Sequence, residues 1–191
     1  TVRCTALRRH VAFTGSVFAD DEDERSRNKK PFTVKIIGFN DYHGTLESPG
    51  SFSPNLAVGN VAKPVGGAEF MAAFVARMKA ANALNVVVGA GDFIGASPLI
   101  SALFFDEPAV ETLNHIGLEF NAVGNHEFDK GAAELRRLQH GGCKLTDGVV
   151  DPNSCKGFGS KQLGQFDGAK FKWLSANVIE TATGRPLLVG T

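Results

Sequence analysis

The sequence lacks net charge. Lys and Arg together number 20, Asp and Glu also number 20, and the formal net charge is therefore zero. A chain with no surplus of positive charge is a poor candidate for a protein that binds polyanions through bulk electrostatics, so no nucleic-acid polymer is expected as a partner. A local site for a small phosphorylated molecule is compatible with this balance. Hydrophobic residues make up 43% of the chain, as is ordinary for a globular protein.

The sequence also lacks a hydrophobic run of the kind that spans a membrane. Its most apolar stretch, 84–105, contains Asp92 near its middle. An unpaired carboxylate is costly inside a bilayer, so no integral membrane span is expected. The stretch instead predicts a core strand, a loop and a helix.

Cysteine is scarce, with three residues in 191. Cys143 and Cys155 fall in one glycine-rich segment, 141–168, and Cys4 lies near the start. A disulfide between Cys143 and Cys155 would suit an oxidising compartment. A zinc site is less favoured, because the segment supplies no second pair of ligands.

The first part of the chain differs in composition from the rest. Residues 1–19 have the basic start, the short apolar stretch and the small residues of a weak signal peptide, although an unstructured or mistranslated terminus is equally compatible. Residues 20–31 read as a charged linker. The folded domain is expected to span 32–191. A leader peptide would make the protein periplasmic or secreted.

From residue 32 onward, short apolar runs alternate with helical patterns. Strands are expected at 34–39, 85–89, 120–123 and 171–179. Helices are expected at 67–81, at 130–140, and from a start at Asp106, as a capping carboxylate, to an end at Gly117. Phe70, Phe74, Met78 and Trp173 are expected in the core. This alternation predicts an α/β fold with parallel neighbouring strands.

Polar residues of the kinds that bind metals follow three successive predicted strands. Asp41 and His43 follow the first, Asp92 the second, and Asn125 and His126 the third. Residues i and i+2 of an extended chain face the same side, so Asp41 and His43 can bind one ion together. Each fragment alone is a common turn. Together they predict a site at the carboxyl edge of the sheet, where ligands of open α/β sheets gather.

These segments resemble a known superfamily. DYHG (41–44), GDFIGAS (91–97) and GNHEFD (124–129) are similar to the first three motif blocks of the calcineurin-like metallophosphoesterases. The longer forms GFNDYHG (38–44), DFIGASP (92–98) and SANV (175–178) resemble the bacterial 5'-nucleotidase and UDP-sugar hydrolase branch. The resemblance implies a partial metallophosphoesterase fold, a β-sandwich flanked by helices, of which this chain holds the first half.

The resemblance also implies two divalent metal ions, Mn, Zn, Mg or Ca. Asp41 and His43 would ligate the first ion, Asp92 would bridge both, and Asn125 would ligate the second. Carboxylate, amide and imidazole ligands without thiolate suit any of these metals.

The catalytic residues that the resemblance implies are His126, Asp129 and Asn125. His126 would stabilise an oxygen at the phosphorus without binding metal, and Asp129 would orient it through a hydrogen bond. Asn125 and His126 would meet the charge that develops on the phosphoryl group. Glu127 is left outside the metal site. Asp129 could also cap the helix expected from Lys130.

The function that this pattern implies is metal-dependent hydrolysis of 5'-nucleotides, or of another small phosphoester, to a nucleoside and phosphate. A 2',3'-cyclic phosphodiesterase or a UDP-sugar hydrolase are alternatives, and a non-catalytic remnant or metal-binding module is an alternative of another class. The family has later Gly-His blocks, whereas this chain has only His140 after His126. We therefore expect a truncated chain with weak activity.

Overall fold

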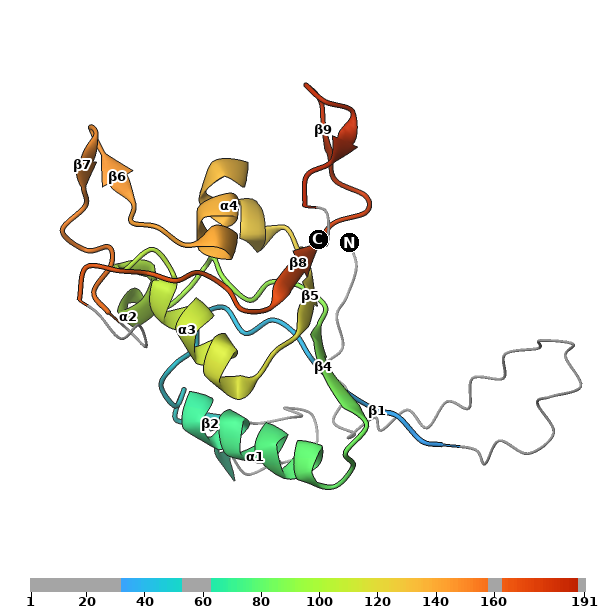
Figure 1. Cartoon of the computed structure of the whole chain (residues 1–191). Helices are drawn as coiled ribbons and strands as arrows, with labels where there is room; N and C mark the ends of the chain where they lie inside the picture. The colour runs from blue at the N-terminus through green and yellow to red at the C-terminus, as the bar shows by residue number, and fades with distance from the viewer. Residues whose placement is uncertain (1–31, 53–62, 158–162, 189–191) are drawn as a thin grey trace, which may run out of the picture.

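The computed structural model describes residues 32–52, 63–157 and 163–188 (Figure 1). The predicted leader (1–19) and charged linker (20–31) lie outside these residues. Within the part that is described, no helix is both long enough and apolar enough to cross a membrane.

The centre of the fold is a parallel sheet of strands β1 (Lys35–Phe39), β4 (Asn85–Gly89), β5 (Phe120–Ala122) and β8 (Lys172–Leu174), hydrogen-bonded in that order. The connections carry helices α1 (Ala68–Ala80), α2 (Leu99–Ala102), α3 (Glu107–Ile116) and α4 (Ala132–His140). The predicted α/β class with parallel neighbours is confirmed. The carboxyl ends of all four strands therefore meet at one edge of the sheet.

Short antiparallel pairs and one 3-10 turn decorate this sheet. β2 (Ser51–Phe52) pairs with β3 (Lys63–Pro64), β6 (Leu145–Thr146) with β7 (Val149–Val150), and β9 (Ile179–Glu180) with β10 (Arg185–Pro186). The 3-10 helix η3 (His126–Phe128) follows β5 directly. The third strand thus runs straight into the segment that the sequence marked as functional.

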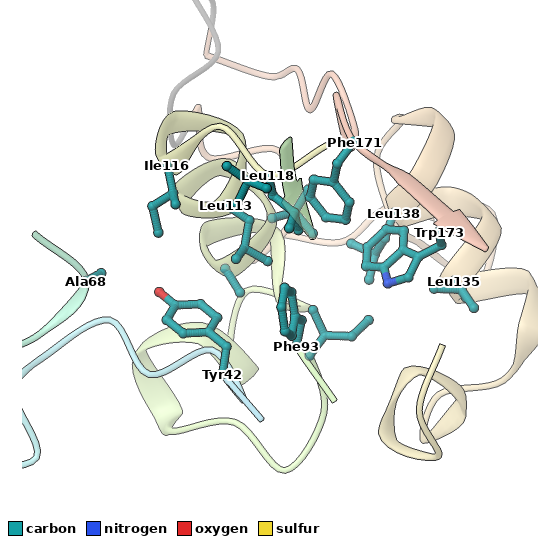
Figure 2. Close-up of a cluster of buried hydrophobic side chains, with 14 of the residues drawn as sticks. Tyr42, Ala68, Phe93, Leu113, Ile116, Leu118, Leu135, Leu138, Phe171 and Trp173 are labelled. Carbon is teal, nitrogen blue, oxygen red and sulfur yellow. The ribbon is translucent and has the colours of Figure 1, made fainter. Parts of the chain in front are cut away.

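The core lies between the sheet and the helices on one side of it (Figure 1). Ile37 and Val87, paired in register, and Trp173 are buried on that face, and Phe93, Leu113, Leu138 and Phe171 pack around them (Figure 2). On the opposite face, Ile36, Phe120 and Leu174 are 48%, 43% and 39% exposed. Both faces of a parallel sheet are normally covered, so exposed apolar side chains on this second face are unusual.

Three local predictions are wrong in detail. The fourth strand ends at Leu174 instead of 179, and Ile179 begins the separate strand β9. Phe70 is 66% exposed, so the prediction that it lies in the core is wrong. Asp106 makes no side-chain cap to α3, because its backbone is left-handed (φ 60°) and its carboxylate instead accepts hydrogen bonds from Ser101 and Lys130. Trp173 is buried as predicted.

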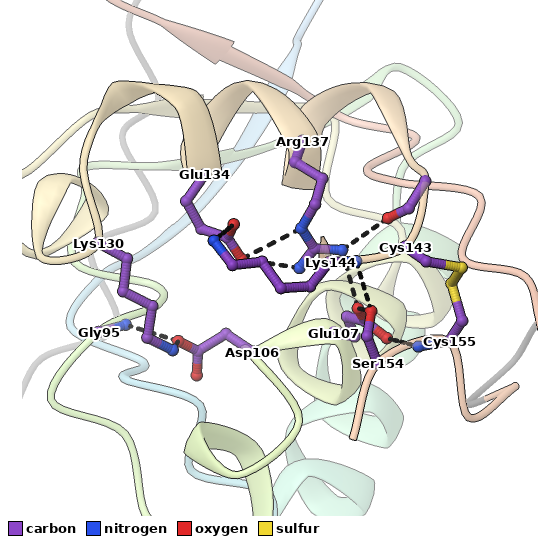
Figure 3. Close-up of polar contacts among 11 residues, drawn as sticks. Gly95, Asp106, Glu107, Lys130, Glu134, Arg137, Cys143, Lys144, Ser154 and Cys155 are labelled. Atoms are coloured by element: carbon purple, nitrogen blue, oxygen red, sulfur yellow. Dashed lines mark hydrogen bonds and ion pairs between the residues drawn. A yellow bond between two sulfur atoms is a disulfide. The ribbon is translucent and has the colours of Figure 1, made fainter. Parts of the chain in front are cut away.

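The glycine-rich segment is cross-linked by the predicted disulfide, Cys143–Cys155 (Figure 3).

Replacing both cysteines by serine is expected to lower the free energy of unfolding by about 2–3 kcal/mol, because the bond closes a short loop in the unfolded chain. Urea unfolding without reductant measures this loss. Reductant should destabilise the native protein to the level of the double variant and leave the variant unchanged. An unchanged native midpoint would contradict the prediction.

Candidate metal site

The first loop of the site follows β1 and is fastened to the second loop by its backbone. The N–H groups of Asp41 and His43 donate to the carbonyl oxygens of Gly91 and Asp92, both at 3.1 Å. Tyr42 points inward and is buried, and its ring meets that of Phe93 edge-on. Asp41 and His43 therefore share the outward side, with Asp41 Oδ1 3.9 Å from His43 Nε2. The two side chains lie close together as expected, but through left-handed turn backbones and not through the extended chain on which the i, i+2 argument rested.

Three of the four predicted ligands have left-handed backbones. The φ angles are 55° at Asp41, 45° at His43 and 57° at Asp92. This region is sparsely populated by residues other than glycine, and backbone strain of this kind concentrates at functional sites. Left-handed residues also occur elsewhere in the chain, for example at Asp147 in an exposed turn, so the angles are compatible with a functional site but do not identify one by themselves.

Glycine makes room for the second loop. Gly91 has φ 103°, and a Cβ there would lie 2.7 Å from the backbone nitrogen of Gly124. A Cβ at Gly124 would overlap the carboxylate of Asp92. The loops after β4 and β5 are thus in backbone contact, and no side chain fits between them.

The third loop contributes an oriented histidine. His126 Nδ1 donates to Asp129 Oδ2 at 2.8 Å, since a carboxylate only accepts. That hydrogen bond is the main cause that raises the pKa of His126, and it also lowers the pKa of Asp129. The arrangement matches the predicted orienting contact. The predicted helix cap by Asp129 is absent, because α4 begins at Ala132 after Gly131 and no side chain caps it.

His43, Asp92 and His126 come together at the carboxyl edge of the sheet. One ligand atom from each lies within 4.8 Å of the others, and all three residues are partly exposed. His43 Nδ1 donates to the carbonyl of Gly95 at 2.9 Å, which leaves its Nε2 free to bind. A carboxylate and two imidazoles, oriented in this way and open to solvent, fit a divalent cation.

The structure distributes the other predicted site residues around this cluster. Asp41 lies beside His43 at the rim, and Asn125 is exposed at the start of η3. Their ligand roles, and the non-ligand role of His126, stay predictions. Glu127 is the residue whose importance the sequence did not reveal, since it is buried beneath the loops and binds their backbone.

Comparisons with known proteins agree with this architecture. The chain is 43% identical over 182 residues to an uncharacterised protein of Acinetobacter calcoaceticus, covering 92% of this chain and 85% of that one. It is 31% identical to the endonuclease YhcR of Bacillus subtilis over 96% of this chain, and 33% identical to a probable 5'-nucleotidase of Treponema pallidum over 57%. It spans only 14% and 18% of the lengths of those last two proteins. No family model matches the chain.

Solved structures share the fold. The NAD nucleotidase of Haemophilus influenzae superposes with a TM-score of 0.56 at 24% identity, over 79% of this chain and 24% of that one. The calcineurin-like phosphoesterase YfkN of Bacillus subtilis gives a TM-score of 0.50 at 18% identity, over 81% of this chain and 40% of that one. The described residues therefore correspond to one part of a larger fold in these neighbours.

Proposed function

We propose that the chain, which belongs to the same family as the Acinetobacter protein and shares the fold of the calcineurin-like phosphoesterase YfkN, is the metal-binding part of a calcineurin-like metallophosphoesterase, a hydrolase that converts 5'-nucleotides to nucleosides and phosphate. The observation that carries the proposal is the meeting of His43, Asp92 and His126 within 4.8 Å at the ends of adjacent strands. The motifs that resemble the 5'-nucleotidase branch support the substrate class, as does the probable 5'-nucleotidase among the relatives.

In this proposal four side chains hold two divalent ions, Mn, Zn, Mg or Ca. Asp41 and His43 would hold one ion, Asn125 would hold the other, and the carboxylate of Asp92 would contribute to both. Such ions polarise phosphoryl oxygens and ionise a bound water near neutral pH. The chemistry of the donor set fits, since all four side chains offer oxygen or imidazole nitrogen and none offers a thiolate.

The remaining residues act on the phosphoryl group and its environment. His126, held by Asp129, presents its other ring nitrogen to an oxygen at the phosphorus. Asn125 adds a neutral amide donor beside the same group. The disulfide supports a periplasmic or secreted location, because such bonds persist in oxidising compartments.

The test is release of inorganic phosphate from AMP in the presence of Mn²⁺. We expect weak release that requires Mn²⁺ and stops with EDTA. His126→Asn should lower it by about 100-fold while Mn²⁺ binding persists, because His126 acts on the substrate. His140→Asn, at the exposed end of α4, is the matched control and should have no effect.

The other outcomes separate the alternatives. Faster turnover of 2',3'-cyclic AMP or UDP-glucose than of AMP would favour those hydrolases. Mn²⁺ binding with no turnover of any substrate would favour a metal-binding module. Absence of Mn²⁺ binding would refute the proposed function.

A further inference from the structure

We propose that Glu127 is a positioning residue, whose buried carboxylate holds the loops after β4 and β5 at the spacing that places Asp92 for a divalent ion and His126 beside that ion. This inference rests on the proposed function. Its own support is a set of contacts within the chain that are independent of any ligand.

The carboxylate of Glu127 is saturated by donors from both loops. The side chain is 2% exposed. Its Oε2 accepts the N–H of Asp92 at 2.9 Å and that of Gly124 at 2.6 Å. Its Oε1 accepts the N–H of Phe93 at 2.8 Å and Asn121 Nδ2 at 3.4 Å. A carboxylate has about four acceptor sites, so both oxygens are fully used.

A return contact links the loops in the opposite direction. The N–H of His126 donates to Asp92 Oδ1 at 3.1 Å. Asp92 and the segment His126–Glu127 are therefore connected twice, once through each carboxylate. The contact fixes the position of one carboxylate oxygen of Asp92, and the direction of the other oxygen is thereby set as well.

A simple capping role does not account for these contacts. A cap of the short helix η3 would involve only backbone groups next to the helix, of which Glu127 binds Gly124, three residues before it. The bonds from Asp92 and Phe93 come from positions 35 and 34 residues earlier in the chain. The two N–H groups belong to the peptide units on either side of Asp92, and the φ of 57° at Asp92 is unfavourable without external support.

The experiment compares Glu127→Gln with the native chain. The amide group of Gln retains the size but replaces one acceptor oxygen by a donor, which would face N–H groups. We expect the variant to fold and to bind Mn²⁺ about 10–100-fold more weakly, the usual effect of losing a residue that orients metal ligands. Electron paramagnetic resonance of free Mn²⁺ gives the affinity. Hydrogen exchange of the amides of Asp92, Phe93 and Gly124, measured without metal, should accelerate in the variant.

Glu111→Gln is the matched control, because Glu111 is a 5% exposed carboxylate on α3 whose polar neighbours are Asn114, Asp167 and Lys170, away from both loops. It should leave Mn²⁺ affinity unchanged. If Glu127→Gln fails to fold, Glu127→Asp replaces it, since it retains the charge but is one methylene too short to reach both loops. Native Mn²⁺ affinity and native amide protection in the folded variant would overturn the role of Glu127. Absence of Mn²⁺ binding by the native chain would instead refute the proposed function.

Discussion

Replacing Asp92 by Asn is expected to abolish measurable Mn²⁺ binding and to lower phosphate release by more than about 100-fold. Loss of a residue that merely orients a ligand costs about 10–100-fold, so loss of a shared ligand should cost more. Asp92 is the carboxylate of the cluster with His43 and His126, and one of its oxygens is already held by the N–H of His126. Asn removes the charge and turns the remaining position into either a neutral oxygen or a donor.

The measurement is Mn²⁺ titration followed by electron paramagnetic resonance, with phosphate release as the second readout. Asp147→Asn is the control, because Asp147 also has a left-handed backbone (φ 53°) but lies exposed in the turn between β6 and β7. Both substitutions preserve shape and remove one charge. Equal Mn²⁺ affinity in the two variants would show that Asp92 is not a ligand, and the metal site would have to be abandoned.

The parts of the fold that the sequence predicted well have a clear local signal. The strand at 85–89 was predictable from its continuous apolar run, the helix near 68–80 from its helical apolar pattern, and the helix at 107–116 from the proline near its start and Gly117 at its end. The fourth strand was overestimated, since the chain leaves the sheet after Leu174, at the more polar residues 175–177, and Ile179 belongs to the separate pair of β9 and β10. The prediction for Phe70 was wrong, because the residues that α1 buries are Ala68 and Val75.

The residue types of the site were predictable from the sequence, but the hydrogen bonds that hold its loops in place were not. Asp41, His43, Asp92 and His126 are residue types that bind metals, and each follows a predicted strand. The role of Glu127 depends on backbone N–H groups of other residues, which every sequence contains and no pattern distinguishes. The left-handed angles at the ligands were not predicted either, because Asp and His adopt this region more often than most residues but do not require it.

A second large effect is expected away from the metal site, where Arg137→Met should lower the free energy of unfolding by about 3–5 kcal/mol. The guanidinium contacts the carboxylates of Glu107 and Glu134 at 2.8 Å each and also donates to the carbonyl of Gly142 (Figure 3). Both glutamates are almost fully buried. Met retains the apolar part of the arginine side chain. The loss of unfolding free energy therefore measures the cost of leaving two buried carboxylates without the cation that they share.

Arg136→Met is the matched control on the same helix. Arg136 is 42% exposed and pairs with Glu180 at 2.7 Å, so its loss should cost less than about 1 kcal/mol. Urea unfolding with the disulfide intact measures both variants. Equal unfolding free energies for the two would contradict the prediction.

The pH dependence gives the Arg137 prediction a sign. Burial acts to raise the pKa of Glu134, but hydrogen bonds from Arg137 and Lys144 outweigh it and hold the pKa below its usual value. Stability from this ionised carboxylate is therefore present above the unfolded-state pKa of about 4.3 and is lost as the pH falls through the lower folded-state value. The deficit of Arg137→Met should be largest at neutral pH and should shrink on acidification. If the difference in unfolding free energy between Arg137→Met and the native chain stays constant as the pH falls below the unfolded-state pKa, the arginine stabilises the fold by packing alone.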